Sequence, residues 1–138
     1  MKVETKLERI QMIDKLIDRK LEDVEKWKAK ALSTTAPMGG ERVQASGSQQ
    51  KMADAVAEYL DIYAELEAEI NALIDEKYKI IRLIERLDIK EYDVLYLHYV
   101  EGLEFGVIAA KYGKSYNWAT EVKRKGIRHL QELIDEET

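Results

Sequence analysis

The longest regular pattern in this chain runs from Gln49 to Leu87, where apolar residues recur at alternating steps of four and three. Its members are Met52, Val56, Tyr59, Tyr63, Leu66, Ile70, Leu73, Lys77, Ile80, Ile84 and Leu87. This is a heptad repeat, apolar except at Lys77, and it predicts one long helix with a continuous apolar seam. Because such a seam has to be covered, the pattern restricts the chain to folds in which helices pack on helices.

A second helical pattern precedes the first and extends from Val3 to about Leu32. Its apolar positions are Val3, Leu7, Ile10, Ile17, Leu21, Val24 and Ala31, with Ile13, Leu16 and Trp27 widening the stripe. Residues 33–48, rich in glycine and small polar residues, separate the two patterns and predict a connector loop. We therefore expect residues 1–87 to form a long antiparallel helical arm. Because the first helix is the shorter one, part of the seam stays uncovered, and we expect a homo-oligomer, with a dimer favoured.

Shorter helical segments follow in residues 88–138. Asp88 suits the cap of a third helix, and Gly102 suits the position just after its end. Gly113 then marks a tight turn, and Ser115 suits the cap of the last helix. The predicted helices span about 89–101, 104–112 and 116–135. The sequence thus predicts an all-α protein in which the arm is followed by a helix-turn-helix domain, residues 88–138.

The charge of the last predicted helix differs from that of the whole chain. The formal net charge of the protein is -5. Between Lys114 and Leu130, in contrast, a single acid, Glu121, is accompanied by the bases Lys114, Lys123, Arg124, Lys125 and Arg128. We interpret this contrast as a focused contact with double-stranded DNA, with a plain solvated face as the alternative.

Helical spacing assigns candidate roles in DNA binding to individual residues. With Ala119, Val122 and Gly126 facing inward, the outward side holds Asn117, Thr120, Glu121, Arg124 and Arg128. In a major groove, Asn117 suits adenine, Arg124 suits guanine and Glu121 suits cytosine. The phosphate candidates are Lys114, Lys123, Lys125 and Arg128, together with the first backbone N–H groups near Ser115 and Tyr116. Trp118 flanks this side and suits packing against a sugar or a thymine methyl group.

The segment from about Tyr92 to Leu133 resembles region 4 of the sigma-70 family. The matching pieces are Tyr99–Leu103, Ile108 with Ala109, Gly113–Ser115 and Tyr116–Leu130. More narrowly, a long helical first half, the connector GGERVQASGS and this C-terminal unit resemble phage-encoded transcription regulators of the ArpU and RinA kind. The resemblance implies a regulator of late or lytic phage genes in the bacterial cytoplasm, which binds promoter-proximal DNA and has RNA polymerase as a further candidate partner.

Other classes of function find less support in the sequence. The chain has no cysteine, and its two histidines, His98 and His129, are not spaced as paired ligands, so we expect no metal site. No P-loop or hydrolase motif is present, and we expect neither an enzyme nor a cofactor. No window is apolar enough to suggest a membrane segment. Two alternatives remain open: a DNA-packaging adaptor of the small-terminase type, and a module that docks on RNA polymerase without touching DNA.

Overall fold

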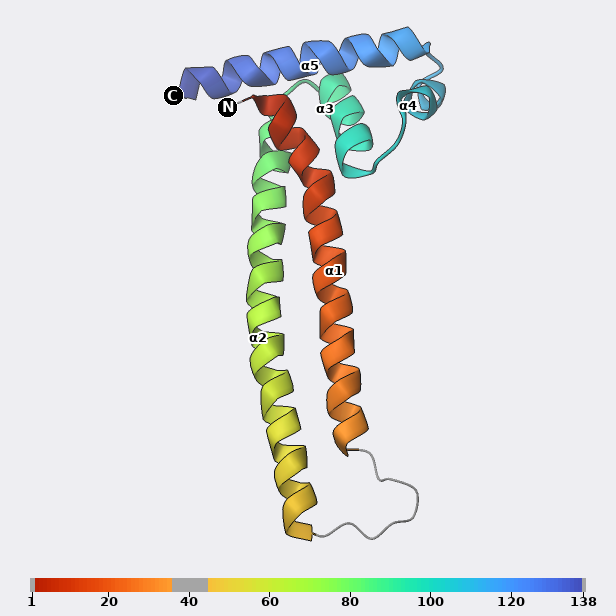
Figure 1. The fold of residues 1–138 in the computed structure, drawn as a ribbon. Coiled ribbons are helices and arrows are strands. Elements are labelled where there is room, and N and C mark those ends of the chain that lie inside the picture. The colour runs from red at the N-terminus through yellow and green to blue at the C-terminus, as the bar shows by residue number, and fades with distance from the viewer. Residues whose placement is uncertain (1, 36–44, 138) are drawn as a thin grey trace. The chain divides into compact units, whose positions relative to one another are not determined.

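The structure, a computed structural model, describes residues 2–35 and 45–137, and all regular secondary structure within these ranges is helical (Figure 1). The elements are α1 (Val3–Thr35), α2 (Ala45–Ile84), α3 (Ile89–Leu95), η1 (Tyr96–Val100), α4 (Phe105–Lys111) and α5 (Tyr116–Glu137). The all-α prediction is therefore confirmed for the described part of the chain. Within it, no helix is both long and apolar enough to cross a membrane.

The long helices α1 and α2 form the predicted antiparallel hairpin (Figure 1). The ammonium group of Lys20 on α1 lies 2.7 Å from a carboxylate oxygen of Glu69 on α2. Further along α1, Trp27 lines a shallow hollow together with Lys51 and Glu58, so rising residue numbers on α1 meet falling ones on α2. The connector predicted at 33–48 is too long at both ends, because α1 continues to Thr35 and α2 begins at Ala45. Residues 36–44 lie outside the described residues.

The chain divides into two compact units. The first comprises Met1–Lys15 and Ile74–Thr138, and the second is Leu16–Leu73. The first unit contains the apolar core, whose members are Val3, Leu7, Ile10, Ile13, Ile80, Ile81, Ile84, Val94, Leu95, Tyr99, Ile108, Ala109, Ala119, Val122 and Leu130. In space, this unit thus reaches beyond residues 88–138 and takes in the start of α1 and the end of α2.

Two polar residues that interrupt the apolar stripes of the hairpin are paired with each other. Lys77 is the one polar position of the long heptad seam, and Asp14 falls on the stripe of α1. In the first unit, the Lys77 ammonium group lies 2.8 Å from a carboxylate oxygen of Asp14. The two interruptions therefore compensate each other across the hairpin, since neither charge is left in the seam without a counter-charge.

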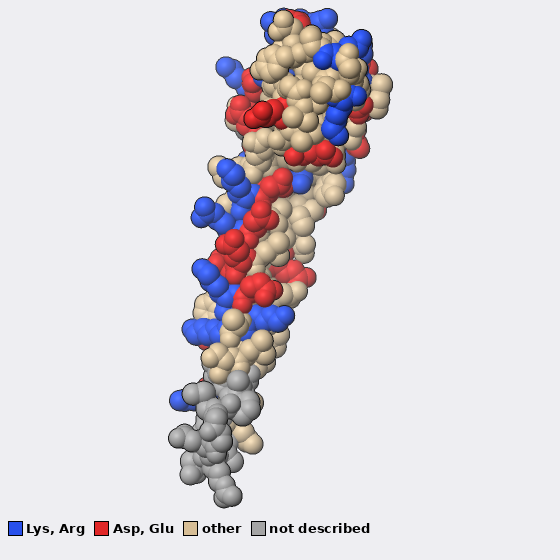
Figure 2. Space-filling model, turned by 90° about the vertical axis from the view of Figure 1, so that its right-hand side faces the viewer, with Lys and Arg blue, Asp and Glu red and all other residues tan. Residues whose placement is uncertain are grey.

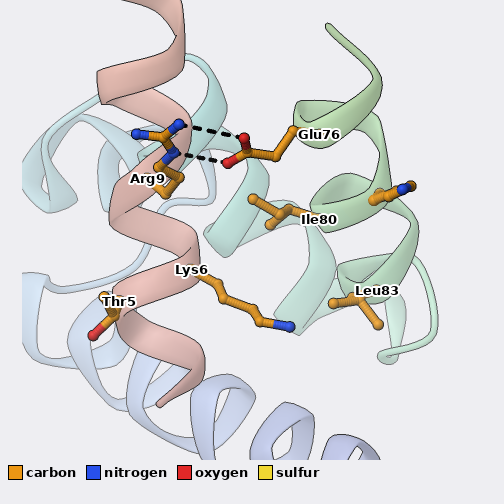
Figure 3. Close-up of a pocket in the computed structure, with 7 residues that line it drawn as sticks. Thr5, Lys6, Arg9, Glu76, Ile80 and Leu83 are labelled. Atoms are coloured by element: carbon orange, nitrogen blue, oxygen red, sulfur yellow. Dashed lines mark hydrogen bonds and ion pairs between the residues drawn. The ribbon is translucent and has the colours of Figure 1, made fainter. Parts of the chain in front are cut away.

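A further ion pair between α1 and α2 joins Arg9 and Glu76 and is shown in Figure 3. The guanidinium group of Arg9 donates to both carboxylate oxygens of Glu76, at 2.7 and 3.3 Å. This bidentate pair lowers the pKa of Glu76. Beside it lies an open hollow of about 370 Å³, lined in part by Ile80 and Leu83 and by the side chain of Lys6.

The helix that begins after Asp88 ends differently from the regular helix we expect. Asp88 caps α3 as predicted, because its carboxylate accepts the N–H of Glu91 at 2.9 Å. From Tyr96 onward the helix widens into the π-helical segment η1, whose last bond joins the N–H of Glu101 to the carbonyl of Tyr96 (3.1 Å). Tyr99 in this segment is buried in the core, and burial raises its pKa. The chain then turns at Gly102, whose φ is +75°.

Candidate nucleic-acid interface

The turn between α4 and α5 has the local geometry that its sequence predicts. The N–H of Lys114 donates to the carbonyl of Ala109 (2.9 Å), and that of Gly113 donates to the carbonyl of Ala110 (3.2 Å). This is the Schellman arrangement, and Gly113 adopts the φ of +64° that it requires. Ser115 then caps α5, because its hydroxyl accepts the N–H of Trp118 at 3.1 Å. Four residues, 112–115, therefore reverse the chain between the two helices.

One side of α5 is fixed by packing on α3 and α4. The buried residues of α5 are Ala119, Val122, Gly126 and Leu130. Val122 joins Val94 and Ile108 in a small apolar cluster. At Gly126 the helices come so close that an added Cβ would lie 3.2 Å from a methyl group of Leu95 and 3.3 Å from the Cβ of Glu91. The inward residues predicted for α5 at 119, 122 and 126 are thus buried, and the opposite side of the helix faces solvent.

The opposite side carries a row of four exposed polar side chains, Asn117, Glu121, Arg124 and Arg128, which we call the outer row. Their steps of four, three and four residues keep them on one side of the helix. The side chain of Arg124 is 72% exposed and forms an ion pair with Glu121. Lys114 and Lys125 are also exposed, and within residues 2–35 and 45–137 neither they nor Arg128 forms an ion pair. The outer row therefore offers an amide, cations and one neutralised acid to solvent.

The other candidate residues of α5 have partners within the fold. Trp118 is half-buried, packs against the apolar cluster, and its ring lies 5.3 Å from that of Tyr112 between centroids. Lys123 is half-buried too, with its ammonium group 3.4 Å from a carboxylate oxygen of Glu4 and 5.7 Å from the ring centre of Phe105. Trp118 and Lys123 thus stand apart from the outer row, in positions that serve packing.

Ser115, Tyr116 and Thr120 complete the set of predicted contacts. The Thr120 hydroxyl donates to the carbonyl of Asn117 (3.0 Å), and the Ser115 hydroxyl is the cap already described. Tyr116 is exposed, and its ring meets that of Phe105 edge to face at 6.3 Å. These residues surround the first turn of α5, where the backbone N–H groups near Tyr116 point out of the helix.

Sequence patterns did not reveal that the start of α1 contacts α5. The N–H of Val3 donates to the side-chain carbonyl of Gln131 (2.9 Å), next to the pair between Glu4 and Lys123. A hollow of about 750 Å³ is lined by Lys2 of this segment together with Arg124 and Arg128. These contacts join residues more than a hundred positions apart, and no local signal predicts them. The first residues of α1 therefore contact α5 beside the outer row.

Side-chain hydrogen bonds connect α3 to α5 and to Tyr112 at the end of α4. Glu91 is 6% exposed, and both of its carboxylate oxygens lie within 2.9 Å of Nδ1 of His129 on α5. Tyr112 donates its hydroxyl to Asp93 at 2.5 Å. Loss of solvation, followed by this bond and the charge of Asp93, raises the pKa of Tyr112 to about 12. The phenol therefore keeps its proton, and the bond, at neutral pH.

His98 holds the other end of α4, where Phe105 begins the helix. Its Nδ1 lies 2.8 Å from the carbonyl of Leu103, and its ring stacks on that of Phe105 with 4.1 Å between centroids. In the described part of the chain, no three acidic or histidine side chains gather as metal ligands.

Comparisons of the chain with known protein families, curated proteins and solved structures found no match.

Proposed function

We propose that the protein is a non-enzymatic, sequence-specific DNA-binding transcriptional regulator, in which α4, the turn and α5 act as a helix-turn-helix. The observation that carries the proposal is the outer row of α5, which lies opposite the buried row and follows a tight turn. A major groove about 12 Å wide admits a helix presented in this way. The resemblance to sigma-70 region 4 and to ArpU- and RinA-type regulators points to late or lytic phage genes as targets, and to RNA polymerase as a second partner.

Within the outer row, we assign base contacts to Asn117 and Arg124 and phosphate contacts to Arg128, with Lys114 and Lys125 flanking it. Arg124 has to leave Glu121 in order to reach a base. An exposed ion pair contributes at most about 1 kcal/mol, so Arg124 can leave Glu121 at little cost. A bidentate contact between arginine and guanine then discriminates against another base by about 1–3 kcal/mol, and Glu121 becomes able to accept from a cytosine.

The test compares two double variants with equal loss of charge. Arg124→Ala with Arg128→Ala removes two cations of the outer row, while Arg19→Ala with Lys26→Ala removes two exposed cations of α1. In fluorescence anisotropy with a labelled random-sequence duplex at low salt, we expect the first variant to bind about tenfold or more weakly. Its salt dependence should also be less steep, by about 0.9 for each lost phosphate contact. The α1 variant should bind like wild type.

The proposal is wrong if both variants bind the duplex like wild type. Circular dichroism of the variants provides the control for folding, because all four side chains are exposed and their loss should leave helicity unchanged. A wild-type protein that ignores duplex DNA but binds RNA polymerase would indicate the protein-docking alternative instead.

A further inference from the structure

The two flanks of α5 on either side of the outer row differ in their cations. Lys125 is exposed on one flank, about 60° around the helix from the centre of the outer row. On the other flank, which faces the start of α1, the corresponding positions hold the uncharged Ile127 and Gln131. The remaining cation toward that side, Lys123, lies 3.4 Å from a carboxylate oxygen of Glu4. Among the described residues, α5 thus offers an unpaired flanking cation on one side only.

A helix that reads a major groove has a phosphate backbone on each side. The groove is about 12 Å wide, close to the roughly 10–12 Å diameter of a helix with its side chains. Both flanks of such a helix therefore come near phosphates, and cations on the two sides fix its register on the duplex. On the flank that α5 leaves without an unpaired cation, the structure places the start of α1.

Lys2, directly before α1, supplies an exposed cation at this place. Together with Arg124 and Arg128 it lines the open hollow of about 750 Å³ beside α5. A second hollow, of about 500 Å³, shares Glu4, Arg124 and Ile127 with the first, so the two adjoin along this flank. Lys2 forms no ion pair with any described residue. Its ammonium group is therefore available beside two cations of the outer row.

The backbone around Lys2 is fixed to α5. Val3 is 1% exposed, and its N–H donates to the side-chain oxygen of Gln131 at 2.9 Å. The next residue, Glu4, forms the ion pair with α5 already described. The carbonyl of Lys2 accepts the N–H of Lys6 at 3.4 Å, in the first turn of α1. Because this backbone is ordered before DNA arrives, a phosphate contact by Lys2 costs only the freedom of its side chain.

Three acids, Glu4, Glu132 and Asp135, also line the hollow of about 750 Å³. Glu4 is paired with Lys123, and Asp135 accepts from the side-chain amide of Gln131 at 3.1 Å. Glu132 lies one helical turn beyond the last residue of the outer row. The acids of α5 in this hollow thus lie past the outer row, and the cationic part of the hollow is the part next to the outer row.

We propose, on the basis of the proposed function of α5, that Lys2 binds a phosphate of the DNA strand that borders α5 on the flank facing α1. Lys125 then contacts the strand on the opposite flank, and the start of α1 forms a second part of the DNA interface. Because a contact with phosphate carries no base information, Lys2 contributes affinity to every duplex sequence alike. The contact also releases a counterion, so the salt dependence of binding reports it.

The test measures binding of the full chain to a labelled random-sequence duplex by fluorescence anisotropy at several salt concentrations. We expect Lys2→Gln to bind about threefold to tenfold more weakly at low salt, with a salt slope less steep by about 0.9. Lys2→Arg keeps the charge and should bind like wild type. Lys15→Gln is the matched control, because Lys15 is exposed on the same helix but about 20 Å further along it. Figure 2 shows acidic and basic side chains interleaved along the hairpin, so Lys15→Gln should also bind like wild type.

The outcomes distinguish Lys2 from the outer row. If Arg124→Ala with Arg128→Ala weakens binding but Lys2→Gln matches wild type, only the role of Lys2 is overturned. A wild type that does not bind duplex DNA overturns the proposed function and the role of Lys2 with it. A weaker Lys2→Gln with the salt slope of wild type also overturns the role of Lys2, because the loss then comes from the fold. Thermal melts followed by circular dichroism check the fold directly.

Cross-linking tests the place of Lys2 independently of its charge. The chain contains no cysteine, so Lys2→Cys and Lys15→Cys each provide one site for a photoactivated azidophenacyl group. On irradiation with the duplex, we expect the conjugate at position 2 to cross-link to DNA and the conjugate at position 15 to remain free. Equal yields from the two conjugates, or no cross-link from position 2 while the protein is bound, would contradict the proposed contact.

Discussion

Charged side chains that lie among apolar residues each contact one polar or oppositely charged partner. Lys77 meets Asp14 within the hairpin seam, and the buried Glu91 meets His129 under α5. Removing one member of such a pair leaves the other without its partner, which costs more than the pair itself contributes. These matched residues explain how a chain with so many charges packs a core in its first unit.

The pair between Arg9 and Glu76 should make the first unit less stable as the pH becomes acidic. Because Arg9 lowers the pKa of Glu76, the pair contributes stability above the usual glutamate pKa of 4.5. That contribution is lost as the pH falls through the lowered value. We expect Glu76→Gln to melt below wild type at about pH 6 and the gap to narrow toward about pH 3, in thermal melts followed by circular dichroism. A gap that widens in acid would contradict this.

At the level of elements, the close contact of α3 with α5 depends on the absence of a side chain at Gly126. Helix propensity favours alanine there by about 1 kcal/mol. Packing opposes it, because the new Cβ would lie 3.3 Å from the Cβ of Glu91, which cannot move without the helix, and 3.2 Å from buried Leu95. Overpacking of this kind costs about 1–3 kcal/mol, so packing outweighs propensity.

Gly126→Ala should therefore lower the free energy of unfolding, by about 1 kcal/mol in denaturant titrations. Gly106→Ala is the matched control, since Gly106 is also helical but nothing lies within 4 Å of an added Cβ. We expect Gly106→Ala to raise the stability by about 0.5–1 kcal/mol. If Gly126→Ala stabilised the protein as well, the close approach of α3 and α5 would be refuted.

How far the sequence predicts these elements depends on whether their causes are local. The caps at Asp88 and Ser115, the turn at Gly113 and the inward residues of α5 follow from rules that act within a few residues, and these predictions are confirmed. The widening at Tyr96–Val100 was missed, because its π-helical bonds accompany the burial of Tyr99 in the tertiary core.

In the candidate site, too, the features with local causes could be predicted from the sequence and those with tertiary causes could not. Helical period alone identifies the four residues of the outer row of α5, but it also places on that side Thr120, which is half-buried. It does not reveal that Lys123 pairs with Glu4 or that Trp118 packs on the cluster around Val94, because these partners come from distant segments. The DNA-binding role of the row itself stays a prediction.

At the scale of the whole molecule, two surfaces of different chemistry lie on the two compact units. The outer row of α5 is polar and cationic and belongs to the first unit, while the second unit, Leu16–Leu73, exposes apolar side chains such as Leu21, Met52 and Leu60. We therefore assign DNA contact to the surface on the first unit only. If two copies also pair, as the half-covered heptad seam predicts, two recognition helices would be joined in one dimer, and the target would contain two half-sites spaced by a whole number of helical turns.

The most direct test of the central claim is an NMR titration of the isotope-labelled full-length protein with a duplex, followed through its backbone amide resonances. The account predicts that shifts concentrate in residues 114–128, around the outer row, and that residues 16–33 and 49–73 are little changed. Shifts confined to the hairpin, or none at low salt where phosphate contacts are strongest, would contradict it.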